Sequence, residues 1–409
     1  MSCNDCQSQS CQKNTPATIV KWRFDYRKLF RLLALVSLVI AWFSGQELNR
    51  PDWKNALQSL YPQATIASID NSDVLFTMTQ KNSDYYVSIA TENSFGGPLT
   101  VASIITSEGK VKSVDILNHS DTPAYIQKLK NAGYFRQFLR KEVDFLPVKD
   151  KNWDAVSGAT LSSNAIMRAN TRASHLIAER YFERTTEPLA STINYTVTHL
   201  LLALLIACSV TNIWLKNQTL KLVYVLASTA VIGFMANQMI SVSNFSAVMM
   251  GFIPSLSENL GLWILLGSTL LAIVLLGKNI YCGNICPFHG VQYLLHKISN
   301  LNLPLFPAVL KHAHYIPKVG LWAGLIVGFL TINPSAGSYE PFSMIFSLQG
   351  EGIQWFILPS ILIGAFFIPD MFCRFFCPAG EMLTLLTLYR NKLVYLIKPI
   401  FVRNKGGSL

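Results

Sequence analysis

The chain has 409 residues, of which 51% are hydrophobic and only 14% are charged, and its mean hydropathy is +0.32. This composition excludes an ordinary soluble protein and indicates a membrane protein. The net charge of +11 does not indicate nucleic-acid binding, because the basic residues flank apolar segments and are not interleaved with aromatic residues on a soluble domain. We therefore expect a lipid bilayer around part of the chain and no nucleic-acid partner.

Long apolar segments are the main feature of the chain. They fall near residues 29–43, 193–214, 220–241, 259–277, 316–332 and 353–369. Several reach the length of about 20 residues that a helix needs to cross the hydrocarbon core. The first segment starts too late and continues too far to be a cleaved signal peptide. The sequence thus predicts six transmembrane helices.

The distribution of lysine and arginine predicts the orientation of these helices. The connections 242–258 and 333–352 contain neither residue, whereas 215–221, 278–318 and the two ends of the chain are basic. Positive residues remain on the cytoplasmic side of a membrane. We expect a multi-pass membrane protein with both termini cytoplasmic and residues 45–190 outside.

The predicted fold class is a multi-domain membrane protein that joins an all-α six-helix transmembrane core to an extracytoplasmic α+β domain. The expected divisions are a cytoplasmic tail (1–28), the first span (29–44), the α+β domain (45–190) and a five-helix membrane domain (191–409). In the tail, Cys3, Cys6 and Cys11 have a spacing suited to a metal, but a fourth ligand is missing. A reduced, flexible tail is the alternative.

Within the α+β domain, residues 64–117 alternate as strands do, with a hairpin turn at Glu108-Gly109-Lys110. Residues 45–62, 123–141 and 164–184 have helical spacing of apolar residues. The domain should therefore consist of strands, two of them joined by a hairpin, with helices before and after them.

The segment 154–163 reads DAVSGATLSS. Taken alone, it fits the start of a helix with Ser157 as the N-cap residue. It also resembles the flavinylation motif of the FMN-binding domain family, which occurs in Rnf complexes, sodium-pumping quinone reductases and NosR-type membrane flavoproteins. The matching residues are Asp154, Ser157, Gly158, Ala159, Thr160 and Ser163.

The resemblance implies that FMN is bound covalently, by a phosphoester to the hydroxyl of Thr160 that a flavin transferase makes during maturation. The residue types suit this role. Gly158 and Ala159 allow a phosphate to approach the backbone, and the N-terminus of a helix stabilises an anion.

Two further segments resemble the same family. Gly96-Gly97-Pro98 precedes the central hairpin, and His119-Ser-Asp-Thr-Pro follows it. The resemblance implies that His119 and Thr122 lie near the flavin. The family continues with glycine where this chain has Ala124, and a turn histidine without a role is the alternative for His119.

Two C-x-x-x-C-P segments follow the fourth and sixth apolar segments. Their cysteines are Cys282 and Cys286, and Cys373 and Cys377. Four thiols are the number that an all-cysteine iron–sulfur cluster needs, and a four-cysteine zinc site is the competing possibility. Disulfides are not expected, because the predicted location faces the reducing cytoplasm.

A membrane core with two such motifs and an outward-facing FMN domain resembles the NosR family and its shorter PceC-type relatives. The resemblance implies a transmembrane electron-transfer component of an oxidoreductase system, with no catalytic residue of its own. Electrons would pass between an iron–sulfur centre, or quinol, on the cytoplasmic side and FMN outside. The implied partners are a cytoplasmic donor or the quinol pool, and a periplasmic reductase or electron carrier. A redox-sensing regulatory or maturation factor for a periplasmic metalloenzyme is the alternative, as is a structural zinc protein without flavin.

Overall fold

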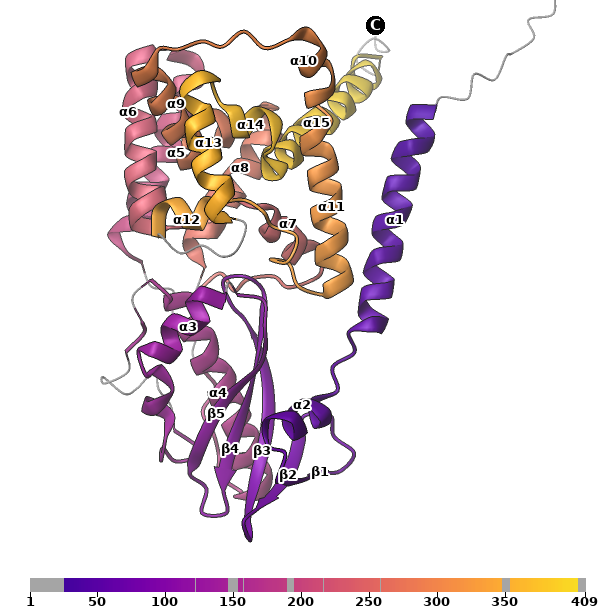
Figure 1. Ribbon diagram of the computed structural model, residues 1–409, viewed down its shortest axis with the longest axis vertical. Coiled ribbons are helices and arrows are strands. Elements are labelled where there is room, and N and C mark those ends of the chain that lie inside the picture. Colours follow the sequence, from indigo (N-terminus) through magenta and orange to yellow (C-terminus); the bar gives the residue numbers. More distant parts are fainter. Residues whose placement is uncertain are drawn as a thin grey trace, which may run out of the picture.

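The structure, a computed structural model, describes residues 26–121, 123–145, 154–156, 158–189, 195–215, 217–257, 259–347 and 354–403. The predictions for Cys3, Cys6, Cys11, Thr122 and Ser157 lie outside the described residues. A sheet domain with its helices occupies one end of the molecule and a helical domain the other (Figure 1). The first helix, α1 (Tyr26–Leu48), runs alongside the helical domain.

The sheet domain contains a five-stranded antiparallel sheet in the order β1-β2-β3-β4-β5. Its strands are β1 (Thr65–Ser68), β2 (Leu75–Gln80), β3 (Ser83–Asn93), β4 (Pro98–Thr106) and β5 (Val111–His119). Each strand pairs with its neighbour in sequence, so every connection is a hairpin. Gly109 turns between β4 and β5 with a φ of +78°, a conformation that favours glycine. The strands and the hairpin predicted from the sequence are present.

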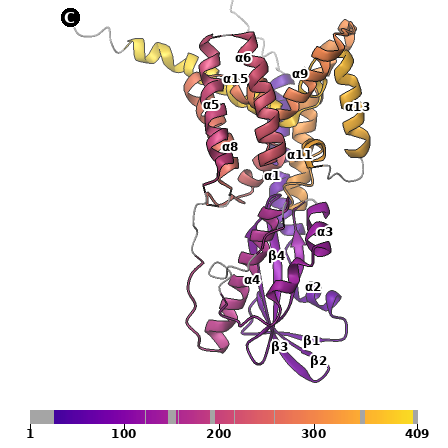
Figure 2. The same cartoon turned by 90° about the vertical axis from the view of Figure 1, so that its left-hand side faces the viewer.

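Helices cover both faces of the sheet. On one face, α4 (Thr160–Tyr181) lies across β3 and β4, where Ile166, Ala169 and Ile177 pack into a fully buried cluster. On the other face, α2 (Trp53–Leu60) buries Leu57 against residues of β1 to β4. Figure 2 shows α4 lying along the sheet below the helical domain. The arrangement fixes the start of α4 at the end of the sheet nearest the helical domain.

Two predicted helices are interrupted. The helix expected over 45–62 ends at Leu48 and restarts as α2 at Trp53, because Pro51 lacks the N–H that a continuous helix requires. The helix expected over 123–141 becomes α3 (Pro123–Asn131) and the 3₁₀ helix η1 (Tyr134–Phe138), separated at Gly133, which has a φ of +66°. Apolar residues recur at helical spacing on both sides of each break, so the pattern alone does not reveal the interruptions.

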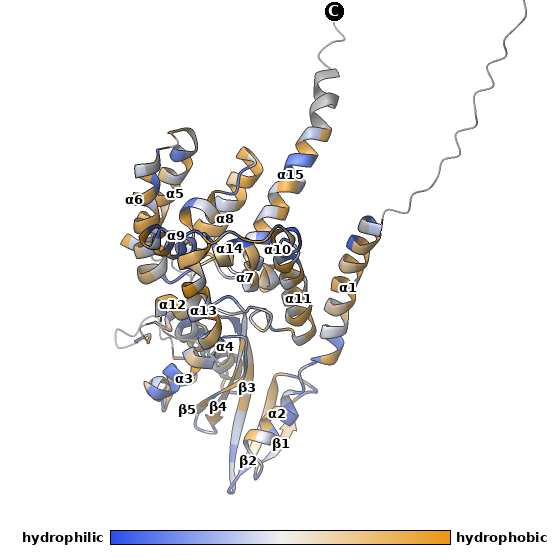
Figure 3. Ribbon diagram, turned by 45° about the horizontal axis from the view of Figure 1, so that its top comes forward, coloured by the Kyte–Doolittle hydropathy of each residue, from blue (hydrophilic) through white to orange (hydrophobic). Residues whose placement is uncertain are grey.

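The described part of the helical domain extends from α5 to α15. Its elements are α5 (Val197–Leu215), α6 (Gln218–Ser228), the π-helix η3 (Thr229–Ala236), α7 (Val242–Met249), α8 (Leu260–Leu276), the π-helix η4 (Tyr281–Ile285), α9 (Pro287–Ser299), α10 (Pro307–Ala313), α11 (Ile316–Thr331), α12 (Phe342–Ser347), α13 (Gln354–Phe367), α14 (Met371–Phe375) and α15 (Pro378–Arg403). Figure 3 shows hydrophobic residues along α1, α5, α6, α8, α11 and α13.

Three apolar helical stretches are long enough to cross a membrane: Lys28–Leu48, Thr219–Ala236 and Leu310–Thr331. Three further apolar helices, Val197–Asn212, Leu260–Leu276 and Gln354–Phe367, are shorter. The protein is therefore rich in helix and has a few candidate membrane spans. The first of them packs closely on α11, since a Cβ atom on Gly45 would lie 1.9 Å from the carbonyl oxygen of Phe329.

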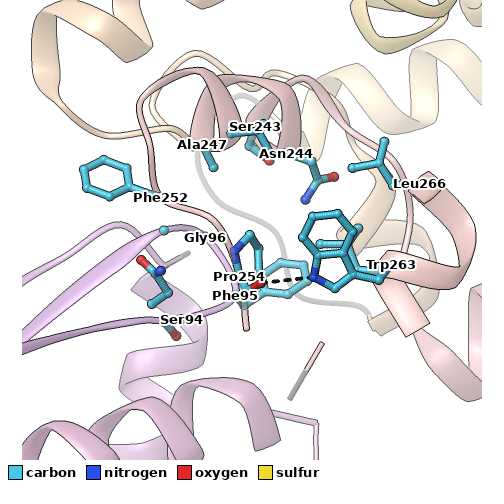
Figure 4. A pocket seen from close by; sticks show the side chains of 14 residues that line it. Ser94, Phe95, Gly96, Ser243, Asn244, Ala247, Phe252, Pro254, Trp263 and Leu266 are labelled. Atoms are coloured by element: carbon cyan, nitrogen blue, oxygen red, sulfur yellow. Dashed lines mark hydrogen bonds between the residues drawn. The ribbon is translucent and has the colours of Figure 1, made fainter. Parts of the chain in front are cut away.

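The sheet domain contacts the helical domain through the loop before β4. Asn93 donates a hydrogen bond from Nδ2 to the carbonyl oxygen of Ile253 at 3.0 Å, and Ser335 Oγ donates to that of Gly96 at 3.0 Å. In Figure 4, Phe95 and Gly96 of this loop lie near the helical-domain segment that contains Pro254 and Trp263. These contacts hold the two domains together at the end of the sheet where α4 begins.

Candidate functional site

Thr160 is an exposed residue at the first position of α4. The N-cap residue is Ala159, and no side chain caps the helix there. The N-cap position therefore falls at Ala159 and not at Ser157, which the alternative reading of this segment offered. The methyl side chain of Ala159 accepts no hydrogen bond, so it does not cap the first N–H groups of the helix. An accessible hydroxyl beside such N–H groups suits attachment of a phosphate.

Ser163 holds the loop that precedes Thr160. Its buried Oγ donates to the carbonyl oxygen of Ala159 at 2.9 Å and accepts from the N–H of Val156 at 3.1 Å. Its carbonyl oxygen accepts a hydrogen bond from the hydroxyl of Tyr134 at 2.6 Å. Ser163 therefore fixes the conformation of the loop before Thr160 through hydrogen bonds to its backbone. Asp154, in contrast, is exposed.

Lys128 of α3 reaches the same loop. Gly158 has a φ of +76°, and a Cβ atom on it would lie 2.7 Å from Nζ of Lys128. A side chain at this position would thus displace the ammonium group. The lysine places a positive charge two residues from Thr160, which fits the phosphate of FMN. Nothing in the sequence distinguishes Lys128 from the neighbouring Lys130.

Asp121 connects the two flavin-related segments. Its buried carboxylate accepts hydrogen bonds from the N–H of Gly96 at 2.6 Å and from Oγ of Ser162 at 2.5 Å, and also from Oγ of Ser94. His119 is half-buried, and its Nδ1 lies 3.0 Å from the carbonyl oxygen of Asp121. Asp121 therefore ties the loop before β4 to the first turn of α4 and orients the segment that carries Thr160.

The four cysteines predicted to bind metal line one cavity of about 230 Å³ in the helical domain. Cys282 belongs to η4 and Cys373 to α14, while Cys286 and Cys377 immediately precede α9 and α15. Proline at the first position of each of these two helices lacks an N–H that would in any case be unpaired there. The structure thus brings together two segments that are far apart in sequence.

Gly380 leaves room beside these sulfur atoms. A Cβ atom on Gly380 would lie 3.3 Å from Sγ of Cys377 and 3.8 Å from Sγ of Cys282. Side-chain amides also contact the thiols: Nδ2 of Asn279 donates to Cys282 Sγ at 3.0 Å, and Nε2 of Gln292 donates to Cys373 Sγ at 3.2 Å. Hydrogen bonds to sulfur are among the features that tune an iron–sulfur cluster.

Burial raises the pKa of all four thiols, that of Cys282 to about 12. The thiols are therefore neutral without a metal, and metal binding must release protons. Among the described residues, no three His, Cys, Asp or Glu side chains form a group suited to a single metal ion. An iron–sulfur cluster has a different requirement, because it is a multi-iron unit that the four thiolates hold from its periphery. The cysteine-lined cavity fits such a group.

A loop between α11 and α12 contacts the chain on both sides of Cys377. The hydroxyl of Tyr339 donates to the carbonyl oxygen of Phe376 at 2.5 Å, and the carboxylate of Glu340 accepts from the N–H of Ala379 at 3.2 Å. Glu340 also accepts from the N–H of Val242 at 2.8 Å. Burial raises the pKa of Glu340 to about 7, although these backbone hydrogen bonds oppose the shift.

Two family comparisons agree with these two sites. Residues 94–175 match the FMN-binding domain, and residues 260–305 and 355–395 match the 4Fe-4S binding domain. The first match includes Asp121 and Thr160, and the second includes all four cavity cysteines. The fold and the sites define a flavin- and iron–sulfur-binding electron-transfer protein with candidate membrane helices.

Among curated proteins, the chain is similar to the regulatory protein NosR of Pseudomonas aeruginosa, at 30% identity over 30% of this chain and 18% of NosR. It is also similar to the protein NirI of Paracoccus denitrificans, at 24% identity over 28% of this chain and 18% of NirI. A component of the proton-translocating ferredoxin:NAD(+) oxidoreductase complex of Clostridium ljungdahlii is 33% identical over 20% of this chain and 48% of that component. The resemblance to NosR-type membrane flavoproteins is therefore confirmed. The matched region spans less than a fifth of NosR.

Proposed function

We propose that this protein transfers electrons across a bacterial inner membrane between an iron–sulfur centre and a covalently bound extracytoplasmic FMN. Cys282, Cys286, Cys373 and Cys377 are the proposed ligands of the centre, and Thr160 is the proposed site of a phosphoester bond to FMN. When bound, these groups supply one-electron chemistry at the cluster and one- or two-electron chemistry at the flavin. The observation that carries the proposal is the cavity on which all four cysteines converge, in a chain that also matches an FMN-binding domain.

The chain itself positions both groups in this proposal. Lys128 and the first turn of α4 bind the phosphate, while Asp121 fixes the turn. The hydrogen bonds from Asn279 and Gln292 hold the thiolates in place. Cys286 and Cys377 are buried and Cys282 and Cys373 are half-buried, which limits the access of bulk water to the centre.

The proposed orientation rests on the distribution of charge. Residues 45–190 face outward and both termini face the cytoplasm, because the outer connections lack lysine and arginine. Residues 191–409 form the five-helix membrane domain of the proposal, and α1 supplies the sixth helix. The proposed partners are a cytoplasmic donor or the quinol pool, a periplasmic reductase or electron carrier, and a flavin transferase.

Proteoliposomes test the electron-transfer function. After photoreduction of the protein, ferricyanide, which does not cross the bilayer, should oxidise the iron–sulfur centre of molecules whose sheet domain faces outward. The EPR signal of the reduced centre should then disappear for the wild type and persist in Thr160→Ala, which lacks the attachment site. Equal rates of oxidation in the two proteins would show that FMN is not part of the electron-transfer path.

A redox-sensing role is the second candidate, because one of the similar proteins is named a regulatory protein. The same experiment separates the two functions. A carrier should turn over repeatedly when reductant and ferricyanide are both supplied, whereas a sensor should be oxidised once and then stop.

Lys128→Met should reduce the fraction of protein that carries FMN several-fold, because the variant removes the positive charge beside the phosphate. Flavin fluorescence of the denatured protein on a gel, normalised to protein, measures this fraction. Lys130→Met is the matched control: Lys130 lies on the same helix but is exposed and should have no effect. Equal losses in both variants would show that Lys128 acts only through the general charge of α3.

A further inference from the structure

The largest cavity described between the two domains has a volume of about 750 Å³. This volume is within the range of about 300–1,000 Å³ that is usual for small-molecule sites. His119, Ser120 and Asp121 line it from the sheet domain, and Asn237 and Glu340 line it from the helical domain. The cavity is distinct from the one that the cysteines line, although Phe342 contributes to the walls of both.

Asn237 belongs to the wall of this cavity. The residue ends the π-helix η3 in a left-handed conformation with a φ of +46°. Its Oδ1 is closed off from solvent and has no hydrogen-bond partner among the described residues. An unpaired buried acceptor is unfavourable, and a turn of the carboxamide toward a donor in the cavity would relieve it. π-Helices also occur frequently at functional sites.

The remaining walls suit a planar aromatic ligand with polar edges. Phe95 and Phe342 supply aromatic surface, Met239 supplies a polarizable thioether, and Ser241 and Ser338 supply hydroxyl groups. Few groups combine a flat apolar body with an imide N–H donor, but the isoalloxazine ring of a flavin does. The lining of the cavity thus fits a flavin-like ring.

The cavity shares a wall with the attachment site. Asp121, which lines the cavity, accepts the hydrogen bond from Ser162, and Ser162 lies two residues beyond Thr160 in the first turn of α4. On the opposite side, Tyr339 and Glu340 line the cavity and bond to Phe376 and Ala379, on either side of Cys377. The cavity therefore lies between the two proposed cofactor sites and contacts the supports of both.

We propose that this cavity binds the isoalloxazine ring of the FMN on Thr160, with the Asn237 carboxamide as the acceptor for the imide N–H of the ring. This inference rests on the proposed attachment at Thr160. In this arrangement, residues 339–340 connect the cavity that holds the ring to the loop that contains Cys377. With both groups bound, this connection would allow one electron to pass, so that one centre is oxidised as the other is reduced and no bond is made or broken.

Iodide quenching of flavin fluorescence in purified wild-type protein tests the placement. The ring should be strongly shielded relative to free FMN. Ala323→Trp places an indole in the cavity wall and should raise the quenching constant several-fold, while gel fluorescence shows unchanged covalent FMN. Asn237→Gly, which tolerates the left-handed conformation of this residue, should raise the constant as well, because the ring loses its acceptor. The second variant keeps the test decisive if the first fails to fold.

Val319→Trp is the matched control. Val319 lies on α11, as Ala323 does, but is exposed and does not line the cavity, so its quenching constant should equal that of the wild type. A ring as accessible as free FMN in the wild type would overturn the placement and leave covalent attachment intact. Absence of covalent flavin from the wild type would overturn both. Unchanged shielding in Ala323→Trp, together with loss of oxidation of added quinol, would assign the cavity to a quinone and refute the proposal.

Discussion

Cys282→Ser should remove nearly all of the iron from the anaerobically purified protein. Each C-x-x-x-C-P segment supplies only two thiolates, and the structure places both pairs around one cavity. Two thiolates are too few to hold such a cluster, and the loss of one of four ligands weakens it, so the loss of iron should be far larger than half. Iron analysis and EPR of the dithionite-reduced protein measure this result. The variant should also unfold at a lower temperature in detergent, because metal binding contributes to folding stability.

Cys208→Ser provides the control for this result. Cys208 is an exposed thiol on α5 and does not line the cavity, so its replacement should leave the iron content unchanged. Retention of about half the iron in Cys282→Ser would instead mean that each segment binds its own metal. Zinc without iron in the wild type would exclude an electron-transfer role for the cysteine site.

Thr160→Ala should abolish covalent FMN completely. The hydroxyl of Thr160 is the proposed acceptor of the phosphoester bond, and alanine offers no oxygen in its place. The helical propensity of alanine is high, so α4 should begin as in the wild type and the protein should still fold. Ultraviolet illumination of a denaturing gel, together with the intact mass of the protein, measures the attachment.

Thr160→Ser distinguishes loss of the hydroxyl from loss of structure. Serine retains an oxygen at the same position, so this variant should keep a measurable part of the attached flavin. A fluorescent band that persists in Thr160→Ala would move the attachment to another residue. Equal circular dichroism spectra of the three proteins would confirm that the differences come from the hydroxyl.

The antiparallel sheet could be predicted because local patterns determine it. Alternation over 64–117 and the glycine at 109 specify strands that pair with their sequence neighbours. The interruptions at Pro51 and Gly133 were harder to predict, because apolar residues recur at helical spacing on both sides of each break. Of the six predicted spans, three correspond to helices of sufficient length, and the other three correspond to shorter apolar helices among the described residues.

The candidate sites also contain some residues that could be predicted from the sequence and others that could not. Thr160 and the four cysteines belong to short motifs that can be read directly from the chain. Lys128 and Glu340 lie beside residues that are distant in sequence, and no local pattern distinguishes them from other lysines and glutamates. The cavity between the domains could not be predicted at all, because it depends on how the loop after α11 meets the loop before β4.

The order of the strands also bears on how the protein is made. Every strand of the sheet pairs with the one before it, and α4 completes the domain before α5 begins. Contacts between residues close in sequence form fast, and domains generally fold in the order in which they are synthesised. We therefore expect the sheet domain to reach its native structure while the later helices are still being translated. Its attachment loop would then be available to a modifying enzyme before the rest of the chain has been inserted.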